Sequence, residues 1–423
     1  MAKQHLLMLG LLLGGGALFS ACSDVKIRSI GDGDAGSKGD AGSTSEGGEG
    51  GEAPYQFPPN LNPQGVIVVG PAPAEHTQLL VGGTDYATQG EIVSITLGTG
   101  AVGKGETYAD GDTAAVSSAG VGFAIERKND KVHLLDGGKI STTFDLKEVG
   151  TDKAPVDSKA YVPVLNQSLI VILDLTKGTV SRRIDLNEYN APGDSDHSAD
   201  VAEGVYDPTN EIAYFLLQRI DRNSYDANFN LPCSKNPGLI VGIDTKTDQV
   251  VDLNGNHPGK AIELKLVNPR SLSVNGDGTA LYMLADGCYE GAKKTSRGVE
   301  VVDLTDGTTT VVYEADGSDS LANYYLSSMI LTGGEDALIA SFHDDDFLTH
   351  WTKFELTAGT LGAELVGVPD AVSFDGTDLL GVKVTDNVGK VVRYKLATQT
   401  STTVSATSWA GDYSYASSTA LVQ

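Results

Sequence analysis

Two segments of the chain, RSLSVNGDGTALYML (residues 270–284) and VEVVDLTDGTTTVVY (residues 299–313), carry the pattern that decides the fold. Each segment consists of two short runs rich in Val, Leu, Thr and Tyr, separated by a turn that contains Asp and Gly. This pattern is typical of antiparallel β-hairpins. Two consecutive hairpins predict a four-stranded meander, which is the unit of a β-propeller blade.

The second hairpin of this unit recurs along the chain. Its copies lie at Ser94–Gly100, His133–Gly138, Ile172–Gly178, Gly242–Asp248, Val302–Gly307, Phe354–Gly359 and Tyr394–Gln399. One such unit cannot bury its apolar faces alone, so repeats of this kind stack against one another. We therefore predict an all-β fold over residues 61–423, a seven-bladed β-propeller of four-stranded antiparallel blades.

The first copy, which begins near Gln78, has no obvious innermost strand of its own. The tail Tyr413–Ser418 has a strand pattern, so we predict that a C-terminal strand completes the first blade and closes the ring. The run Val66–Val69 is an alternative candidate for the same place.

Two repeats resemble those of a known family. Residues 243–251 (IDTKTDQVV) and 268–278 (NPRSLSVNGDG) are similar to the repeats of YVTN/lactonase-like seven-bladed β-propellers. The resemblance implies the fold for roughly residues 64–423. It implies little about function, because propellers include both enzymes and binding modules.

The N-terminus has the features of an exported lipoprotein. Residues 1–21 combine a cationic start with an apolar run from Leu6 to Phe19, as in a signal peptide. The sequence Phe19–Cys22 resembles the bacterial lipobox, which implies lipidation of Cys22. An ordinary secretory signal with a coincidental cysteine is the alternative. Ser23 after the cysteine favours the outer membrane by resemblance to proteobacterial sorting.

Residues 22–60 are rich in Gly, Ser, Asp and Glu, a composition that cannot offset the entropy lost on ordering. We interpret them as a disordered tether between the lipid and the propeller. The expected location is therefore the cell envelope, as an outer-membrane lipoprotein that is periplasmic or surface-exposed. The formal charge of −26 argues against nucleic acid as a partner and leaves the N-terminal lipid as the contact with the membrane.

Long insertions separate some of the predicted strands and are expected to share one face of the ring. They are Glu188–His197, Asp221–Pro237, Gly287–Arg297, Asp316–Tyr324 and His343–Trp351, and they concentrate in blades four to six. Loops on a rigid scaffold are frequent places for function. Cys233 and Cys288 lie in two of these insertions, and in an exported chain they predict a disulfide, with two buried thiols as the alternative.

Several residues in or near the insertions are candidates for ligand binding: Asp196, His197, Asp200, Arg270, Tyr324, His343 and Trp351. Four of them, Asp196, His197, Asp200 and His343, offer oxygen and imidazole ligands for a divalent cation such as Ca²⁺. Solvated carboxylates and aromatic rings packed beneath the loops are the alternative explanations.

The sequence contains no nucleophile elbow, Walker loop, dinucleotide-binding fingerprint or haem-attachment motif. We therefore favour an envelope lipoprotein whose propeller binds a small ligand or a protein without catalysis. A specific version of this hypothesis places it beside an outer-membrane transporter. One alternative is a metal-dependent, lactonase-like hydrolase with its site at the propeller funnel. Another is a structural or adhesive surface protein.

Overall fold

A computed structural model describes residues 60–423, except 74, 85–87, 149, 151, 153, 227–229, 234–235, 254–259, 291–292, 316–319, 322–323, 344–345, 347, 386–387 and 405–415. The proposed signal peptide, Cys22 and nearly all of the proposed tether lie outside these residues. None of the described helices is long and apolar enough to cross a membrane.

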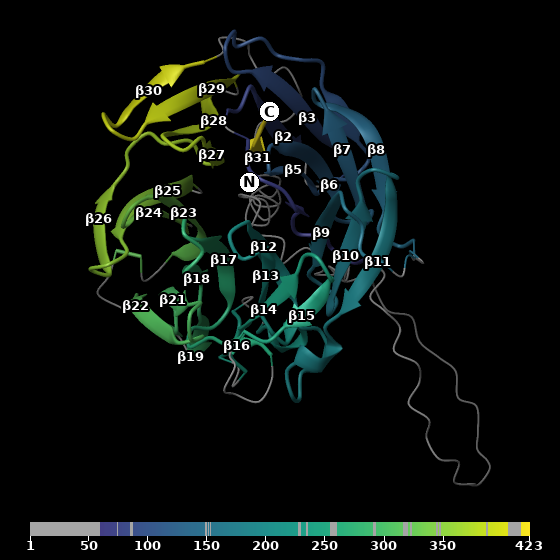
Figure 1. Ribbon diagram of the computed structural model, residues 1–423. Coiled ribbons are helices and arrows are strands. Elements are labelled where there is room, and N and C mark those ends of the chain that lie inside the picture. Colours follow the sequence, from purple (N-terminus) through teal and green to yellow (C-terminus); the bar gives the residue numbers. More distant parts are fainter. Residues whose placement is uncertain are drawn as a thin grey trace, which may run out of the picture.

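Seven of the eight sheets formed by the described strands are antiparallel blades arranged in a ring, which Figure 1 shows along its axis; the eighth is a two-stranded ribbon. From the axis outward, blade 1 consists of β31 (Ala416–Val422), β2 (Gln78–Thr84), β3 (Gly90–Thr96) and β4 (Glu106–Tyr108). Blade 2 consists of β5 (Thr113–Ser118), β6 (Val121–Glu126), β7 (Lys131–Asp136) and β8 (Lys139–Asp145). Blade 3 consists of β1 (Ile67–Val68), β9 (Lys159–Val164), β10 (Leu169–Asp174) and β11 (Thr179–Asp185).

The remaining blades follow in chain order. Blade 4 consists of β12 (Val201–Asp207), β13 (Ile212–Leu217), β14 (Leu239–Asp244) and β15 (Gln249–Val251), with β16 (Ile262–Glu263) also paired to β14. Blade 5 consists of β17 (Pro269–Val274), β18 (Ala280–Ala285), β21 (Gly298–Asp303) and β22 (Thr309–Glu314). Blade 6 consists of β23 (Tyr325–Gly333), β24 (Asp336–His343), β25 (Leu348–Glu355) and β26 (Thr360–Glu364). Blade 7 consists of β27 (Val372–Phe374), β28 (Asp378–Thr385), β29 (Val388–Lys395) and β30 (Thr400–Thr403). The predicted seven-bladed propeller is confirmed.

The hydrophobic core is divided among the interfaces between neighbouring blades. Seven buried clusters occur, one between each adjacent pair, including the pair formed by blades 7 and 1. Successive side chains of a strand point to opposite faces, so one strand can contribute to two clusters. In β2, Leu79 and Val81 pack on blade 7, whereas Leu80 packs on blade 2. The clusters therefore hold the ring together on every side.

The two ends of the described chain each complete a blade. The C-terminal strand β31 pairs with β2, from Gln78 opposite Val422 to Gly83 opposite Ala416, which confirms the predicted closure of blade 1. The described strand overlaps the predicted Tyr413–Ser418 from Ala416 onward, and residues 413–415 of that prediction lie outside the described residues. In contrast, the run Val66–Val69 does not compete for blade 1. It contains β1, which pairs with β9 and is the innermost strand of blade 3.

A local sequence similarity explains the place of β1. Asn62-Pro63 precedes the innermost strand of blade 3, and Asn268-Pro269 occupies the same place in blade 5. Asn62 and Asn268 both have a positive φ, 53° and 56°, and each accepts a backbone hydrogen bond, from Leu165 and Asp286 respectively. The segment that begins at Leu61 is therefore a displaced copy of the repeat's own first strand.

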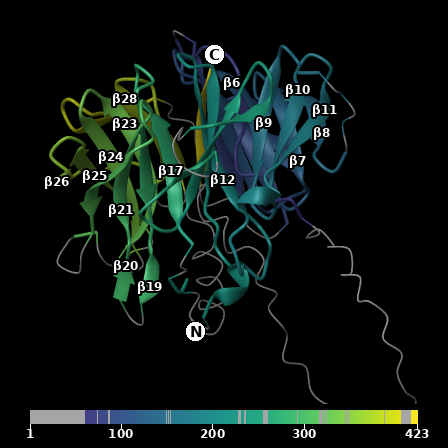
Figure 2. The same ribbon diagram turned by 60° about the horizontal axis from the view of Figure 1, so that its bottom comes forward.

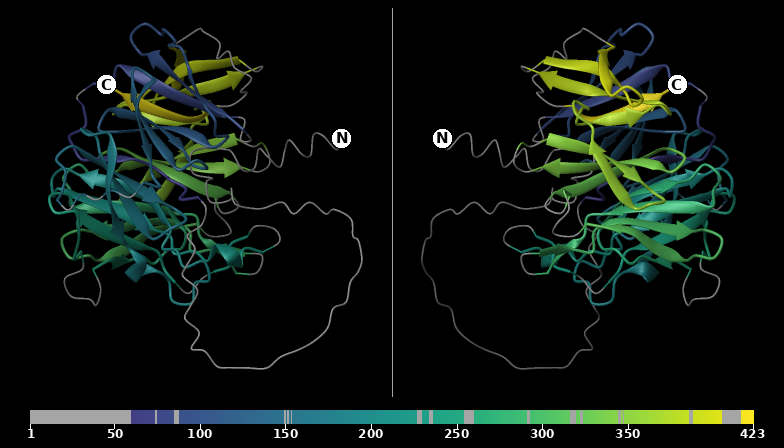
Figure 3. Two further views of the ribbon diagram at one scale, coloured as in Figure 1. Left: turned by 90° about the vertical axis from the view of Figure 1, so that its right-hand side faces the viewer. Right: turned by 90° about the vertical axis from the view of Figure 1, so that its left-hand side faces the viewer.

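The ring has two faces, and the strands run from one face to the other. Figure 3 shows the ring edge-on from two opposite sides. We call one the loop face; it carries the connections between blades and those between second and third strands. The other, the turn face, carries the remaining hairpin turns. Figure 2 shows that the ribbon formed by β19 (Cys288–Glu290) and β20 (Lys293–Thr295) extends from the loop face, whereas the C-terminus lies at the turn face.

Candidate functional site

The long insertions meet on the loop face, as predicted. Asn236 donates a hydrogen bond to the carbonyl of Pro192, which joins the first two insertions. Cys233 and Cys288 form the predicted disulfide, joining the insertions of blades 4 and 5, and Pro232 bridges to Tyr289 beside it. Arg297 donates a hydrogen bond to the carbonyl of Tyr324. These contacts make the loop face continuous from blade 3 to blade 6.

The predicted insertion of blade 6 is largely regular strand. β24 extends to His343, and β25 begins at Leu348. His343 is stacked between Tyr324, with ring centroids 3.3 Å apart, and His350, at 3.8 Å. Trp351 is buried, and its indole N–H donates to the carbonyl of Pro369. The Trp351 ring therefore belongs to the core between blades 6 and 7.

The connection from β11 to β12 contains the sequence Asp-Ser-Asp-His-Ser-Ala-Asp at residues 194–200, together with the short helix η2 (Asn187–Tyr189). Its backbone is shaped by turns in which a side chain accepts the N–H two residues further on. Asp194 accepts from Asp196 at 3.1 Å, Asp196 from Ser198 at 2.9 Å, and the Ser198 hydroxyl from Asp200 at 3.1 Å. Such local hydrogen bonds are the usual preference of Asp and Ser in loops.

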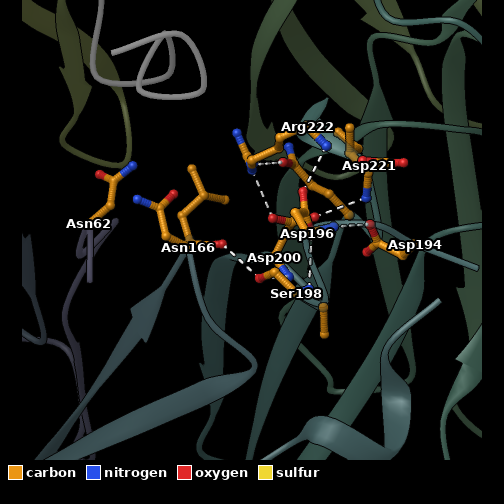
Figure 4. Close-up of polar contacts among 12 residues, drawn as sticks. Asn62, Asn166, Asp194, Asp196, Ser198, Asp200, Asp221 and Arg222 are labelled. Carbon is orange, nitrogen blue, oxygen red and sulfur yellow. Dashed lines mark hydrogen bonds and ion pairs between the residues drawn. The ribbon is translucent and has the colours of Figure 1, made fainter. Parts of the chain in front are cut away.

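The facing loop, between β13 and β14, begins with the short helix η3 (Arg222–Ser224), whose N-cap is Asp221. Residues of this loop donate hydrogen bonds to the Asp-rich connection (Figure 4). The backbone N–H of Arg222 donates to Asp196 at 2.7 Å, and the Arg222 Nε donates to Asp200 at 2.8 Å. Asp200 is fully buried and also accepts the N–H of Ile220 at 2.9 Å.

A group of three carboxylates results from this contact. Among the residues that the structure describes, Asp194, Asp196 and Asp221 form the one His/Cys/Asp/Glu group whose ligand atoms all lie within 4.8 Å of one another. Asp194 is 5% exposed, and within the described part of the chain its Oδ2 atom has no hydrogen-bond partner. Burial, followed by the neighbouring charge of Asp196, raises the pKa of Asp194 to about 7.

This group shares only Asp196 with the predicted metal ligands. Asp200 is occupied by its ion pair with Arg222, while burial raises the pKa of Asp200 and the Arg222 charge opposes that change. His197 is exposed, with a φ of 57°, and His343 belongs to the stack in blade 6. The Asp-Ser-Asp stretch indicated Asp194, but nothing in the local sequence marked Asp221, which lies 25 residues beyond Asp196.

Arg270 lies in β17, near a buried group of charges in blade 5. Lys294 is paired with Asp286 at 2.7 Å and lies over the Tyr325 ring at 4.3 Å from its centroid. Burial lowers the pKa of Lys294 to about 8, against the effect of Asp286. Asp286 also accepts the backbone N–H of Leu326, so this group fastens the β19–β20 ribbon to blade 6.

Comparison with known proteins finds only distant structural similarity. No protein-family model and no curated protein matches the chain. Among solved structures, the chain is similar to the periplasmic gluconolactonase of Pseudomonas aeruginosa, with a TM-score of 0.49 and 13% identity over 77% of this chain and 94% of that one. It is also similar to the calcium-binding protein regucalcin of Agrobacterium tumefaciens, with a TM-score of 0.40 and 15% identity over 63% and 80% of the two chains. A third similar structure is that of a nidogen/laminin complex, with a TM-score of 0.43 and 12% identity over 82% and 98%.

Proposed function

We propose that this protein is an envelope-anchored lipoprotein whose loop face binds Ca²⁺ and, next to it, a small ligand or protein partner, without catalysis. The observation that carries the proposal is the carboxylate group of Asp194, Asp196 and Asp221, in which Asp194 is buried with an unpartnered oxygen. Burying an unpaired carboxylate oxygen is costly, and a cation would remove that cost.

The donor set suits calcium better than a transition metal. All three groups are carboxylates, and Ca²⁺ prefers oxygen ligands, of which it takes six to eight. Three carboxylates leave coordination positions for water, backbone carbonyls or an acidic group of a partner. A cation at this place would also join the β11–β12 connection to the β13–β14 loop, and thereby stiffen the loop face.

The hydrolase alternative has less support from the same geometry. A hydrolase would need a base beside the cation. Asp200 is neutralised by Arg222, and His343 lies in the ring stack of blade 6 rather than in the carboxylate group. The Asp-rich group is thus better suited to holding a cation than to activating water.

The place where the chain enters the propeller is compatible with a membrane anchor. The backbone N–H groups of Leu61 and Asn62 donate to Asp130, which lies in the loop between the second and third strands of blade 2. Residues 22–60 would therefore attach to the loop face. Even fully extended, they reach at most about 140 Å. A lipid on Cys22 would keep the loop face near the membrane and near a membrane-embedded partner.

Isothermal titration of the metal-free protein with CaCl₂ tests the proposal. We expect one calcium ion to bind, and we expect Asp196→Asn and Asp221→Asn to weaken binding at least about tenfold by removing a ligand charge. Asp136→Asn, at an exposed residue on the turn face, removes the same charge and should leave binding unchanged. Equal calcium binding in all four proteins would exclude the site.

The anchor needs a separate test. Metabolic labelling with palmitate should mark the wild-type protein and not Cys22→Ala. Recovery of the wild-type protein in a soluble periplasmic fraction, unlabelled, would contradict the lipoprotein assignment without affecting the calcium site.

A further inference from the structure

A second candidate site lies on blade 3, beside the β11–β12 connection that carries the carboxylate group. It is a cavity of about 350 Å³, lined by Gln167, Ser168, Leu169, Arg183, Asp185, Asn187 and His197. This volume lies at the lower end of the range of about 300–1,000 Å³ found for small-molecule pockets. Gln167, Ser168 and Leu169 are buried, whereas Asp185, Asn187 and His197 are exposed. The cavity therefore has a buried base and an exposed rim.

The base of the cavity contains polar atoms that the protein leaves unsatisfied. Gln167 is 3% exposed, and neither its amide nitrogen nor its amide oxygen has a hydrogen-bond partner among the residues that the structure describes. Most buried side-chain polar atoms are paired, because a buried polar atom without a partner loses its hydrogen bonds to water and gains none in return. The Ser168 hydroxyl, in contrast, has hydrogen-bond partners within the protein: it donates to Asn190 and accepts the backbone N–H of Ala199.

Arg183 supplies an uncompensated positive charge. It is half-buried and forms no ion pair with the residues that the structure describes. One of its N–H groups donates a hydrogen bond to the carbonyl of Leu146. Its Nε atom is buried and has no hydrogen-bond partner among the described residues. The one carboxylate on the cavity wall, Asp185, accepts the backbone N–H of Asn187.

From these groups we infer that the cavity on blade 3 binds a small hydroxycarboxylate. The ligand carboxylate would pair with Arg183, whose guanidinium matches a carboxylate in geometry and charge. A ligand hydroxyl can both donate and accept, which is what the two unpaired atoms of Gln167 require. His197, on the exposed rim, would contact the ligand from the solvent side. This inference does not depend on calcium binding.

The test compares two probes that differ only at the acid group, glycerate and its neutral analogue glyceramide. Saturation-transfer NMR and calorimetric titration are carried out on the full-length protein, once with calcium and once with EGTA. We expect glycerate to bind in both media, and glyceramide to bind at least about tenfold more weakly. Absence of glycerate binding at millimolar concentration would overturn the inference. Equal binding of the two probes would exclude a carboxylate as the recognised group.

Variants then locate the site. Arg183→Gln and Gln167→Leu should each weaken glycerate binding about tenfold or more, while Lys353→Gln, an exposed residue on blade 6, should not. Unchanged melting temperatures would show that the variants remain folded. Unchanged glycerate affinity in both cavity variants would refute the assignment. Binding of glutamate-containing peptides in preference to glycerate would also refute it, because it would indicate a protein partner.

Discussion

The connections on the two faces of the propeller differ in regularity: those of the turn face repeat from blade to blade, and those of the loop face do not. On the turn face, one hairpin turn recurs in blade after blade: the backbone N–H of its last residue donates to the carbonyl four residues earlier, as in Gly178 to Asp174 and Gly307 to Asp303. The last residue has a positive φ, 69° in Gly178 and 73° in Gly307. Glycine adopts this backbone conformation without strain.

The loop face has no such repetition among its described residues. Each blade there carries different contacts: the Asp-rich connection before blade 4, the disulfide between blades 4 and 5, and the stacked rings of blade 6. We infer from this difference that the turn face maintains the ring, whereas the loop face holds the groups that are suited to binding. The predictions below test that division, beginning with the largest expected effect.

The first prediction concerns the turn face. Asp248, the last residue of the blade 4 turn, is buried and accepts hydrogen bonds from Lys159, Arg182 and Tyr161 of blade 3. Asp248→Asn should destabilise the protein by about 3–5 kcal/mol, because it leaves two cations without their carboxylate. Urea unfolding measures the effect. Asp136→Asn should change stability by less than about 0.5 kcal/mol, and a similarly small effect for Asp248→Asn would refute the structural role.

The second prediction concerns the disulfide of the loop face. Cys233 and Cys288 are 55 residues apart, so their bond restricts a long loop of the unfolded chain. The double variant Cys233→Ala/Cys288→Ala should lose about 2–4 kcal/mol. Adding a reductant should destabilise the wild-type protein and leave the variant unaffected. If the loop face serves to bind ligands and is not needed to hold the blades together, the variant should keep the far-ultraviolet circular dichroism spectrum of a propeller. Its calcium affinity should fall.

The third prediction is a pH dependence. The pKa of Asp194 is about 7 in the folded protein and about 3.9 in an unfolded chain, so between these values the folded state binds the extra proton. Without calcium, stability should therefore fall as pH rises towards 7, with a slope of at most about 1.4 kcal/mol per pH unit from this residue. Asp194→Asn should remove that slope. Saturating calcium should stabilise the protein most at high pH, and a calcium effect independent of pH would contradict the assignment.

The fourth and smallest prediction returns to the repeated turn. Gln399 ends the blade 7 turn with a φ of 53°, where several other blades use glycine. Gln399→Gly should stabilise the protein by up to about 1 kcal/mol, since it removes the strain of a left-handed conformation. The reverse change in blade 3, Gly178→Gln, should destabilise it by a similar amount. Melting temperatures of both variants measure the effect, and shifts of the same sign would contradict the equivalence of the turns.

Much of the fold could be predicted because its determinants are local. Each hairpin depends on neighbouring residues, such as Asp174 accepting the N–H groups of Thr176 and Lys177 within its own turn. Their spacing predicts the number of blades, and the missing first strand predicts closure from the C-terminus. The place of β1 was missed, although the repeated Asn-Pro pair before it and before β17 was visible in the sequence.

The candidate sites depend on contacts that no short segment contains. The sequence by itself determined the ring, the disulfide and the Asp-rich turn at 194–200, because adjacent residues and their spacing are enough for these features. Only the tertiary structure brought Asp221 to Asp194 and paired Asp200 with Arg222. It also placed Arg183, which has no ion pair with the described residues, in one cavity with Gln167, whose amide has no hydrogen-bond partner among them. These arrangements arise from the packing of whole blades, which decides which distant loops meet and which polar groups are left without partners.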